Sequence, residues 1–272
     1  QRYKCLECGF RFVQDDGFFR MRNNPQKITQ SVDMFYRGIS TRGVQEHLAM
    51  FFPHNADHST VLRWVWRYAK AIGKFTDKLK ITTGEEIQFD EIEYKRRLSH
   101  KKGVRGTEDN YFADGIDPTT KFMVVGEYVK SRSKQKMASI VSESKKRITS
   151  QIQMVTTDGL TVYSNIIKKV WGYNNKLQKY NVFHNRVVTS NEDTFNYPIE
   201  RLHNNVRART KVFRGFHGSL RSANLILKGY EIYYNFIRIN QAINKRPYEL
   251  ATDLKLKENN KWLELIQLAK GN

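Results

Sequence analysis

The spacing of apolar residues changes at residue 84, and this change limits the folds open to the chain. From there, apolar and polar residues alternate as they do in β-strands. In EEIQFDEIEYKR, one side of the strand carries Ile87, Phe89 and Glu91, and the other carries Gln88, Asp90 and Ile92. Residues 110–129 form two apolar runs around Asp117-Pro118-Thr119-Thr120, a sequence typical of a hairpin turn. The segment therefore predicts one strand followed by a two-stranded hairpin.

Helices and strands alternate in the sequence that follows. Residues 131–150 predict a helix with an apolar seam, QIQMVTTDG predicts a strand ending at Asp158-Gly159, and TVYSNIIKKVW predicts a second helix. KYNVFH predicts another strand, and Pro198 can open the next helix because its missing N–H is not needed there. Aromatic residues at helical spacing then predict a long helix over about residues 219–240. Strand, hairpin, helix, strand, helix, strand, helix is the order of an RNase H-like α/β domain, a mixed five-stranded sheet with flanking helices.

Three short helices are predicted ahead of this domain. Thr29 can cap the first, which ends at Gly38; Ser40 or Thr41 can cap the second, and Asp57 or Ser59 the third. This pattern fits a helix-turn-helix domain over residues 26–80, whose last helix enters the major groove of DNA. The residues predicted to face DNA are Thr60, Arg63, Arg67 and Lys70. The alternative is a three-helix bundle whose basic residues are only solvated.

The N-terminal segment, residues 1–25, contains the two cysteines of the chain, Cys5 and Cys8. Their Cys-x-x-Cys spacing, among aromatic and basic residues, is that of one half of a zinc ribbon, whereas structural zinc requires four ligands. The segment therefore predicts an incomplete zinc site; the alternative is a tight turn with two thiols. So few cysteines in 272 residues indicate a reducing, intracellular setting.

The net charge of the chain points to a polyanionic partner. Forty-seven Lys and Arg against 27 Asp and Glu give +20 at pH 7, well beyond the magnitude of about 2–8 usual for a small domain. No run of 18 apolar residues or secretory signal is present, so no membrane partner is expected. Nucleic acid is therefore the expected partner.

Three acids fall where an RNase H-like fold can bring them together. Asp90 lies in the first strand, Asp158 ends the fourth strand, and Glu200 lies in the first turn of the helix after the fifth. Carboxylates are ligands that magnesium and manganese prefer, and two such ions can promote displacement at phosphorus. Each acid also has an ordinary alternative: a solvated strand residue, a turn residue and a helix-start residue, respectively. Glu91 and Glu93 compete for a role beside Asp90.

The blocks around these acids carry a family resemblance. FDEIEY, VTTDGLTVYSNII and N-x-x-IER-x-H-x-x-x-R-x-R-x-K-x-x-RGF resemble the three acidic blocks of insertion-sequence DDE transposases, relatives of retroviral integrases. The resemblance implies that Asp90, Asp158 and Glu200 are catalytic and hold two magnesium or manganese ions. It also implies cleavage and strand transfer at transposon ends by a prokaryotic, intracellular protein that acts as a dimer or higher oligomer. The alternatives are a domesticated relative that binds DNA without cutting it and a nuclease of the same fold.

The resemblance places the catalytic domain at residues 84–245, ahead of a helical tail at 246–272. After Glu200, the basic residues of the helix are expected to contact the DNA backbone. The residues in this group are His203, Arg207, Arg209, Lys211 and Arg214. For His203, packing against the protein is the alternative.

Overall fold

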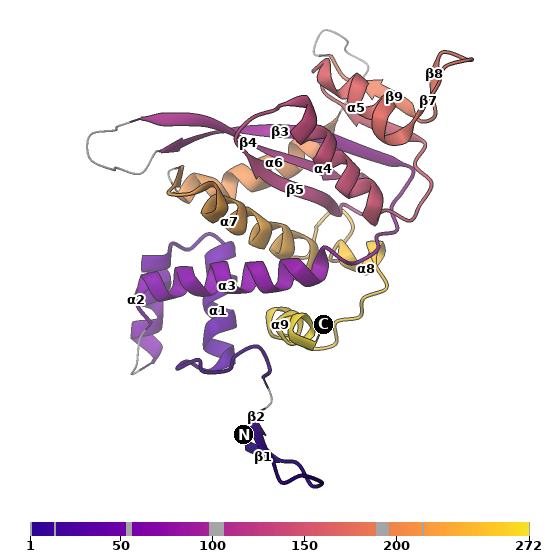
Figure 1. The fold of residues 1–272 in the computed structure, drawn as a ribbon. Helices are drawn as coiled ribbons and strands as arrows, with labels where there is room; N and C mark the ends of the chain where they lie inside the picture. Colours follow the sequence, from indigo (N-terminus) through magenta and orange to yellow (C-terminus); the bar gives the residue numbers. More distant parts are fainter. Residues whose placement is uncertain are drawn as a thin grey trace.

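A computed structural model describes residues 2–13, 15–52, 56–97, 106–188, 196–213 and 215–271. A mixed sheet with helices on both faces forms the upper body in Figure 1, and a group of N-terminal helices lies below it. None of the helices in these ranges combines the length and the apolar character that a bilayer crossing requires.

The central sheet is mixed, as predicted, but its fifth strand is Phe183–Arg186, so the predicted strand over residues 179–184 overlaps it only at the end. Its order is β5-β4-β3-β6-β9, which is consistent with an RNase H-like fold. β3 is antiparallel to β4 and parallel to β6, and β6 is parallel to β9. A short sixth strand, β10, which the sequence did not reveal, pairs with the far end of β3. The strands are β3 (Glu86–Arg97), β4 (Thr107–Ile116), β5 (Met123–Val129), β6 (Met154–Thr157), β9 (Phe183–Arg186) and β10 (Phe216–His217).

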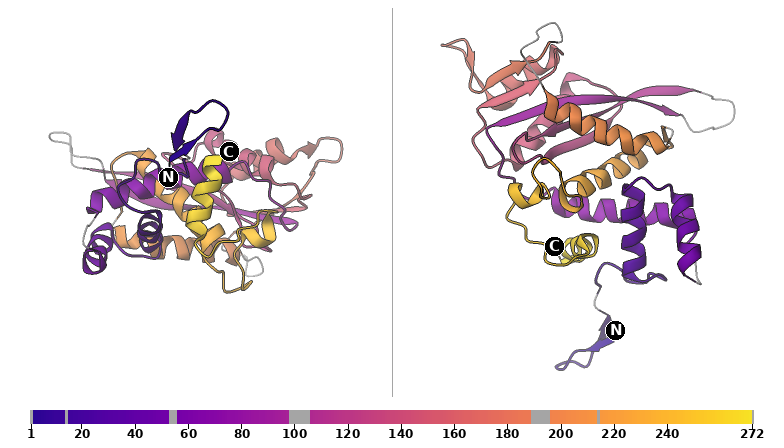
Figure 2. Two further views of the ribbon diagram at one scale, coloured as in Figure 1. Left: turned by 90° about the horizontal axis from the view of Figure 1, so that it is seen from below. Right: turned by 180° about the vertical axis from the view of Figure 1, so that it is seen from behind.

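Helices cover both faces of this sheet. α4 (Lys134–Arg147) and α5 (Val162–Trp171) lie on one face, where Tyr163 reaches Glu91 of β3. α6 (Tyr197–Thr210) lies on the other face, where His203 reaches Asp90 of β3 (Figure 2). The apolar seam of α4 is buried as predicted.

Three helices precede the sheet, as the sequence predicts. They are α1 (Pro25–Tyr36), α2 (Thr41–Phe51) and α3 (His58–Thr76). Of the two caps predicted for each helix, the side chain of Ser40 caps α2 and that of Asp57 caps α3. The prediction for α1 is wrong: Asn24 caps it, and Thr29 lies inside the helix with its hydroxyl donating to Pro25 O. Pro25 fits at the helix start, which allows α1 to begin earlier than Thr29.

The C-terminal helices join the N-terminal helices to the sheet. α7 (Leu220–Ile232) continues into a π-helical segment, η2 (Tyr233–Ile237), and the chain then passes through α8 (Tyr248–Ala251) to α9 (Lys261–Gly271). The ring of Tyr36 on α1 stacks on Tyr233 and on Trp262 of α9. The hydrophobic core consequently runs without a break from α1 to the sheet.

Smaller elements complete the described chain. Cys5 and Cys8 lie in the turn between β1 (Arg2–Lys4) and β2 (Arg11–Val13), which extend away from the body in Figure 1. N–H groups of Cys8 and Glu7 lower the pKa of the Cys5 thiol. A turn of this kind suits a metal ligand, although zinc binding stays a prediction. The other short elements are β7 (Tyr173–Asn174), β8 (Lys179–Tyr180) and the 3-10 turn η1 (Lys211–Phe213).

Candidate functional site

Two of the predicted acids meet because β3 and β6 run in parallel register. Phe89 of β3 pairs with Thr157 of β6; Asp90 is the next residue on β3, and Asp158 is the residue that follows β6. β6 stops at Thr157, so the edge of β3 is open beside Asp90. Asp158 is fixed there by its own turn, in which its Oδ1 accepts from Leu160 N at 3.0 Å.

Glu91 is a third member of this cluster. Ligand atoms of Asp90, Glu91 and Asp158 all lie within 4.8 Å of one another. The hydroxyl of Tyr163 on α5 donates to Glu91 Oε1 at 2.7 Å and holds this side chain in place. The sequence predicts Glu91 only as a competitor of Glu93 for a role beside Asp90, although one signal distinguishes it: its side of the strand also carries Ile87 and Phe89, which are buried. An acid on a buried strand side requires a partner.

Two carboxyl groups of the cluster, those of Asp90 and Glu91, ionise less readily than usual. Burial, with smaller contributions from neighbouring acids, raises the pKa of Asp90 to about 6 and that of Glu91 to about 7. Interactions with His203 and Tyr163 oppose these shifts without cancelling them. Half-buried carboxylates that repel one another are stabilised by a cation placed between them.

The shift at Glu91 predicts an inverse relation between pH and stability. The folded state holds the proton of Glu91 up to about pH 7, whereas the unfolded state releases it near pH 4.3. Without metal, ionisation therefore destabilises the fold as the pH rises through this window. We expect Glu91→Gln, which keeps an acceptor for Tyr163, to exceed the wild type in unfolding free energy by about 2 kcal/mol at about pH 8 and to match it at about pH 4. Urea unfolding in the presence of a chelator measures this difference, and a gap independent of pH would contradict the assignment.

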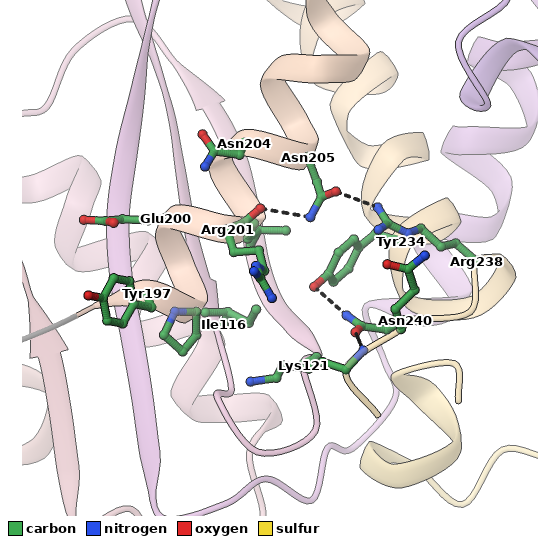
Figure 3. A pocket seen from close by; sticks show the side chains of 14 residues that line it. Ile116, Lys121, Tyr197, Glu200, Arg201, Asn204, Asn205, Tyr234, Arg238 and Asn240 are labelled. Atoms are coloured by element: carbon green, nitrogen blue, oxygen red, sulfur yellow. Dashed lines mark hydrogen bonds between the residues drawn. The ribbon is translucent and has the colours of Figure 1, made fainter. Parts of the chain in front are cut away.

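Glu200 lies at the start of α6, outside that cluster. α6 runs along β3: Ile199 N donates to Gln88 Oε1 at 3.3 Å, and the hydroxyls of Thr210 and Tyr94 lie 3.0 Å apart. Glu200 is therefore near the Gln88–Asp90 end of the strand, one helical turn before His203. Among the described side chains, the set within 4.8 Å does not include its carboxylate. Glu200 is exposed, and in Figure 3 it points away from Arg238 and Asn240.

His203 fixes α6 on the sheet and does not face DNA. Its ring is 2% exposed, with Nε2 2.7 Å from Asp114 Oδ1 and Nδ1 3.6 Å from Asp90 Oδ2. Asp114 is opposite Asp90 on β4, so the ring spans both strands. The predicted DNA contact is therefore wrong, and the alternative of a histidine packed against the protein holds. The pair positions the helix that carries Glu200.

Most of the other predicted DNA-binding residues are at the surface. Arg63, Arg67 and Lys70 are exposed on α3 and Thr60 is half-buried, while Lys74 continues the same stripe at helical spacing. On and after α6, Arg207 and Lys211 are exposed.

Arg209 departs from this prediction, because it is 5% exposed and its guanidinium lies 4.4 Å from the ring centroid of Phe35 on α1. It packs against α1 and is almost entirely removed from solvent. Arg214 lies outside the described residues.

Comparisons with known proteins give the family. No curated protein sequence matches the chain. A solved structure, the Drosophila P element transposase strand transfer complex, is similar over 92% of this chain and 65% of that chain, at 11% identity and a TM-score of 0.37. This chain therefore spans less than two thirds of that chain's length. The family described as transposase, Mutator family, matches residues 18–191, a range that includes Asp90 and Asp158. This match confirms the resemblance to transposases, and the chain belongs to the Mutator family of transposases.

Proposed function

We propose that the chain cleaves transposon ends and joins them to target DNA in a reaction that depends on divalent metal ions. The observation that supports this most strongly is the cluster of Asp90, Glu91 and Asp158 at the open edge of β3. Family membership supports transposition as the biological setting. The alternative function, DNA binding without cleavage, has no separate support among the described residues.

The donor set of the cluster fits magnesium or manganese. Both ions prefer oxygen ligands, and the cluster offers only carboxylate oxygens. Burial raises the pKa of Asp90 and of Glu91, and a divalent cation bound beside these carboxylates would favour their ionised forms. Asp90 and Asp158 would hold the first ion, and Glu200 would complete a second site beside them. When bound, two such ions activate an attacking oxygen and stabilise the leaving oxygen at a phosphodiester.

Several residues of the chain hold the carboxylates ready for this role. The turn at Leu160 orients Asp158, and the N–H of Glu91 donates to Asp90 Oδ1 at 2.7 Å. Tyr163 holds Glu91, and the His203–Asp114 pair anchors α6 and hence Glu200. Positioning of this kind matters because the reacting groups must meet in a fixed geometry.

We further propose that DNA lies along two basic surfaces. The first is the exposed stripe Arg63, Arg67 and Lys70 on α3, in the unit of residues 26–80 that we take as a helix-turn-helix domain. The second is formed by Arg207, in the C-terminal half of α6, and Lys211, which follows the helix. Lys and Arg on such surfaces bind phosphates and position the duplex. The catalytic domain is then 84–245 with the helical tail 246–272, and the Cys5–Cys8 turn of segment 1–25 is a partial zinc site. Because two element ends must be joined, we expect at least a dimer, acting in the cytoplasm or nucleoid of a prokaryote.

The experiment that tests this function uses a supercoiled plasmid carrying the gene of the chain with its natural flanking DNA. We expect nicking and end joining with magnesium or manganese, and none in a chelator. Binding to the same DNA should persist in the chelator, because basic residues supply it, and should weaken steeply with salt. Binding without nicking would reject the enzyme and favour a domesticated DNA-binding protein.

A further inference from the structure

A pocket of about 780 Å³ lies beside α6, on the side away from the carboxylate of Glu200 (Figure 3). The pocket is bounded by α6, by the end of β4 with the turn after it, and by η2 with the loop that follows. Its volume falls in the range of about 300–1,000 Å³ typical of pockets that hold one small ligand. A paired DNA duplex is too wide to enter such a space.

The charge of the lining favours a phosphate. Lys121, Arg201 and Arg238 line the pocket, and Glu200 at its edge is the acid among the lining residues. Arg238 is already oriented, because its Nη1 donates to Asn205 Oδ1 at 3.1 Å. Asn205 in turn donates to Arg201 O at 2.9 Å, which ties the cation to α6. A fixed guanidinium recognises phosphate oxygens well, because its donors are arranged in a planar fork.

The rest of the lining favours a nucleobase. Asn204, Asn240 and Gln241 offer amide donors and acceptors of the kind that read base edges. Tyr197 is 62% exposed at the rim, where an aromatic ring can stack on a base. The same small space therefore combines groups suited to the base and to the phosphate of one nucleotide.

The backbone on the far wall is a rare conformation. η2 is a π-helix that ends at Ile237, and the N–H of the next residue, Arg238, donates to Tyr233 O at 2.9 Å. Single π turns are uncommon in proteins, and many of those that occur lie at functional sites. This turn sets Tyr234 and Arg238 into the pocket, where the hydroxyl of Tyr234 accepts from Asn240 Nδ2 at 3.3 Å.

We propose that this pocket binds one unpaired nucleotide of the DNA strand that is cut at the acidic cluster. The assignment rests on the proposed function. Glu200 belongs to the lining of the pocket, and His203, one turn later on the same helix, is 3.6 Å from Asp90, so α6 connects the pocket to the cluster. The unpaired nucleotide sets the position of the strand relative to the cluster, and duplex DNA bound elsewhere on the protein does not need it.

The test measures binding of the full chain in a chelator, so that cleavage plays no part. The probes are a duplex with a single-stranded overhang carrying 2-aminopurine and the same duplex with blunt ends. We expect Arg201→Gln and Asn204→Ala, both at exposed positions, to weaken binding of the overhang probe about tenfold while binding of the blunt probe changes by less than about threefold. Lys169→Gln on α5, across the sheet, is the matched charge control and should leave the ratio of the two affinities unchanged.

Each result bears on the proposal. Equal losses on both probes, or no loss on either, would overturn it. Competition by free deoxyadenosine monophosphate at micromolar concentration would also overturn it, because the ligand would then be a free nucleotide and not part of a strand. Since these measurements need no metal, they can succeed where plasmid cleavage fails, and they can fail where cleavage succeeds.

Discussion

Replacing Asp158 by asparagine is expected to lower metal-dependent DNA cleavage by at least ~10³-fold. The carboxylate is one of three whose ligand atoms lie within 4.8 Å, and an amide cannot supply its charge to a divalent ion. The fold should survive, because Asn retains the oxygen that accepts from Leu160 N. DNA affinity should stay within about threefold of the wild type, since Lys and Arg supply most of the binding. Nicking of the plasmid and binding to the same DNA measure the two effects separately.

Asp109→Asn is the matched control for this substitution. Asp109 is exposed on β4 and lies outside the acidic cluster, so the same chemical change there should leave the cleavage rate unaltered. Cleavage by the Asp158→Asn protein at a rate near that of the wild type would reject the acidic cluster as the active site. A parallel loss of binding would instead show that Asp158 supports the fold.

Replacing Gly229 by alanine should destabilise the protein although alanine favours helices. A Cβ at this position of α7 would lie 1.9 Å from the hydroxyl oxygen of Tyr36 and 3.1 Å from Cβ of Ala69. Tyr36 cannot retreat easily, because its ring is 2% exposed and stacked on Tyr233 and Trp262. We expect a net loss of about 2 kcal/mol, since overpacking costs typically about 1–3 kcal/mol or more and exceeds the helical preference for alanine. Urea unfolding measures this loss.

A second substitution tests the cause of this loss. Tyr36→Phe removes the hydroxyl oxygen, the closer of the two Tyr36 atoms that collide with the new Cβ, and leaves Cζ at 2.5 Å. It should therefore restore part of the stability of Gly229→Ala while costing stability in the wild type. Gly271→Ala, whose Cβ would meet no atom within 4 Å, should change stability by less than about 0.5 kcal/mol. Additive effects of the two substitutions at Gly229 and Tyr36 would contradict a direct contact between them.

Much of the fold was predictable because its elements have strong periodic patterns. The alternation around Phe89 and the seam of α4 identify a strand and a helix without further information. The docking of α7 on α1 was not predictable, since it depends on Gly229 fitting under Tyr36, residues far apart in the chain. The π-helical end of α7 was missed for a similar reason: its pattern of aromatic residues is also that of an α-helix.

The candidate site was predictable where strand order determined it. Asp90 and Asp158 meet because β3 and β6 are parallel neighbours, and each acid directly follows one member of the Phe89–Thr157 pair. The burial of Arg209 could have been predicted, because at helical spacing it continues the buried stripe of Ile199, Leu202 and Val206. His203 was misplaced because its partner Asp114 lies on a different strand, and spacing along the helix gives no information about that strand.

Iron-mediated cleavage of the protein backbone tests most directly whether Asp90, Asp158 and Glu200 belong to one metal-binding centre. In this experiment the full chain is loaded with Fe²⁺ in place of magnesium. Peroxide and ascorbate are then added, and the radicals formed at the bound iron cut the backbone next to it. We predict cuts around Asp90, Asp158 and Glu200, suppressed by excess magnesium and lost together in Asp158→Asn. Cuts absent from any of these three segments, or unchanged in the Asp158→Asn protein, would contradict a shared metal site.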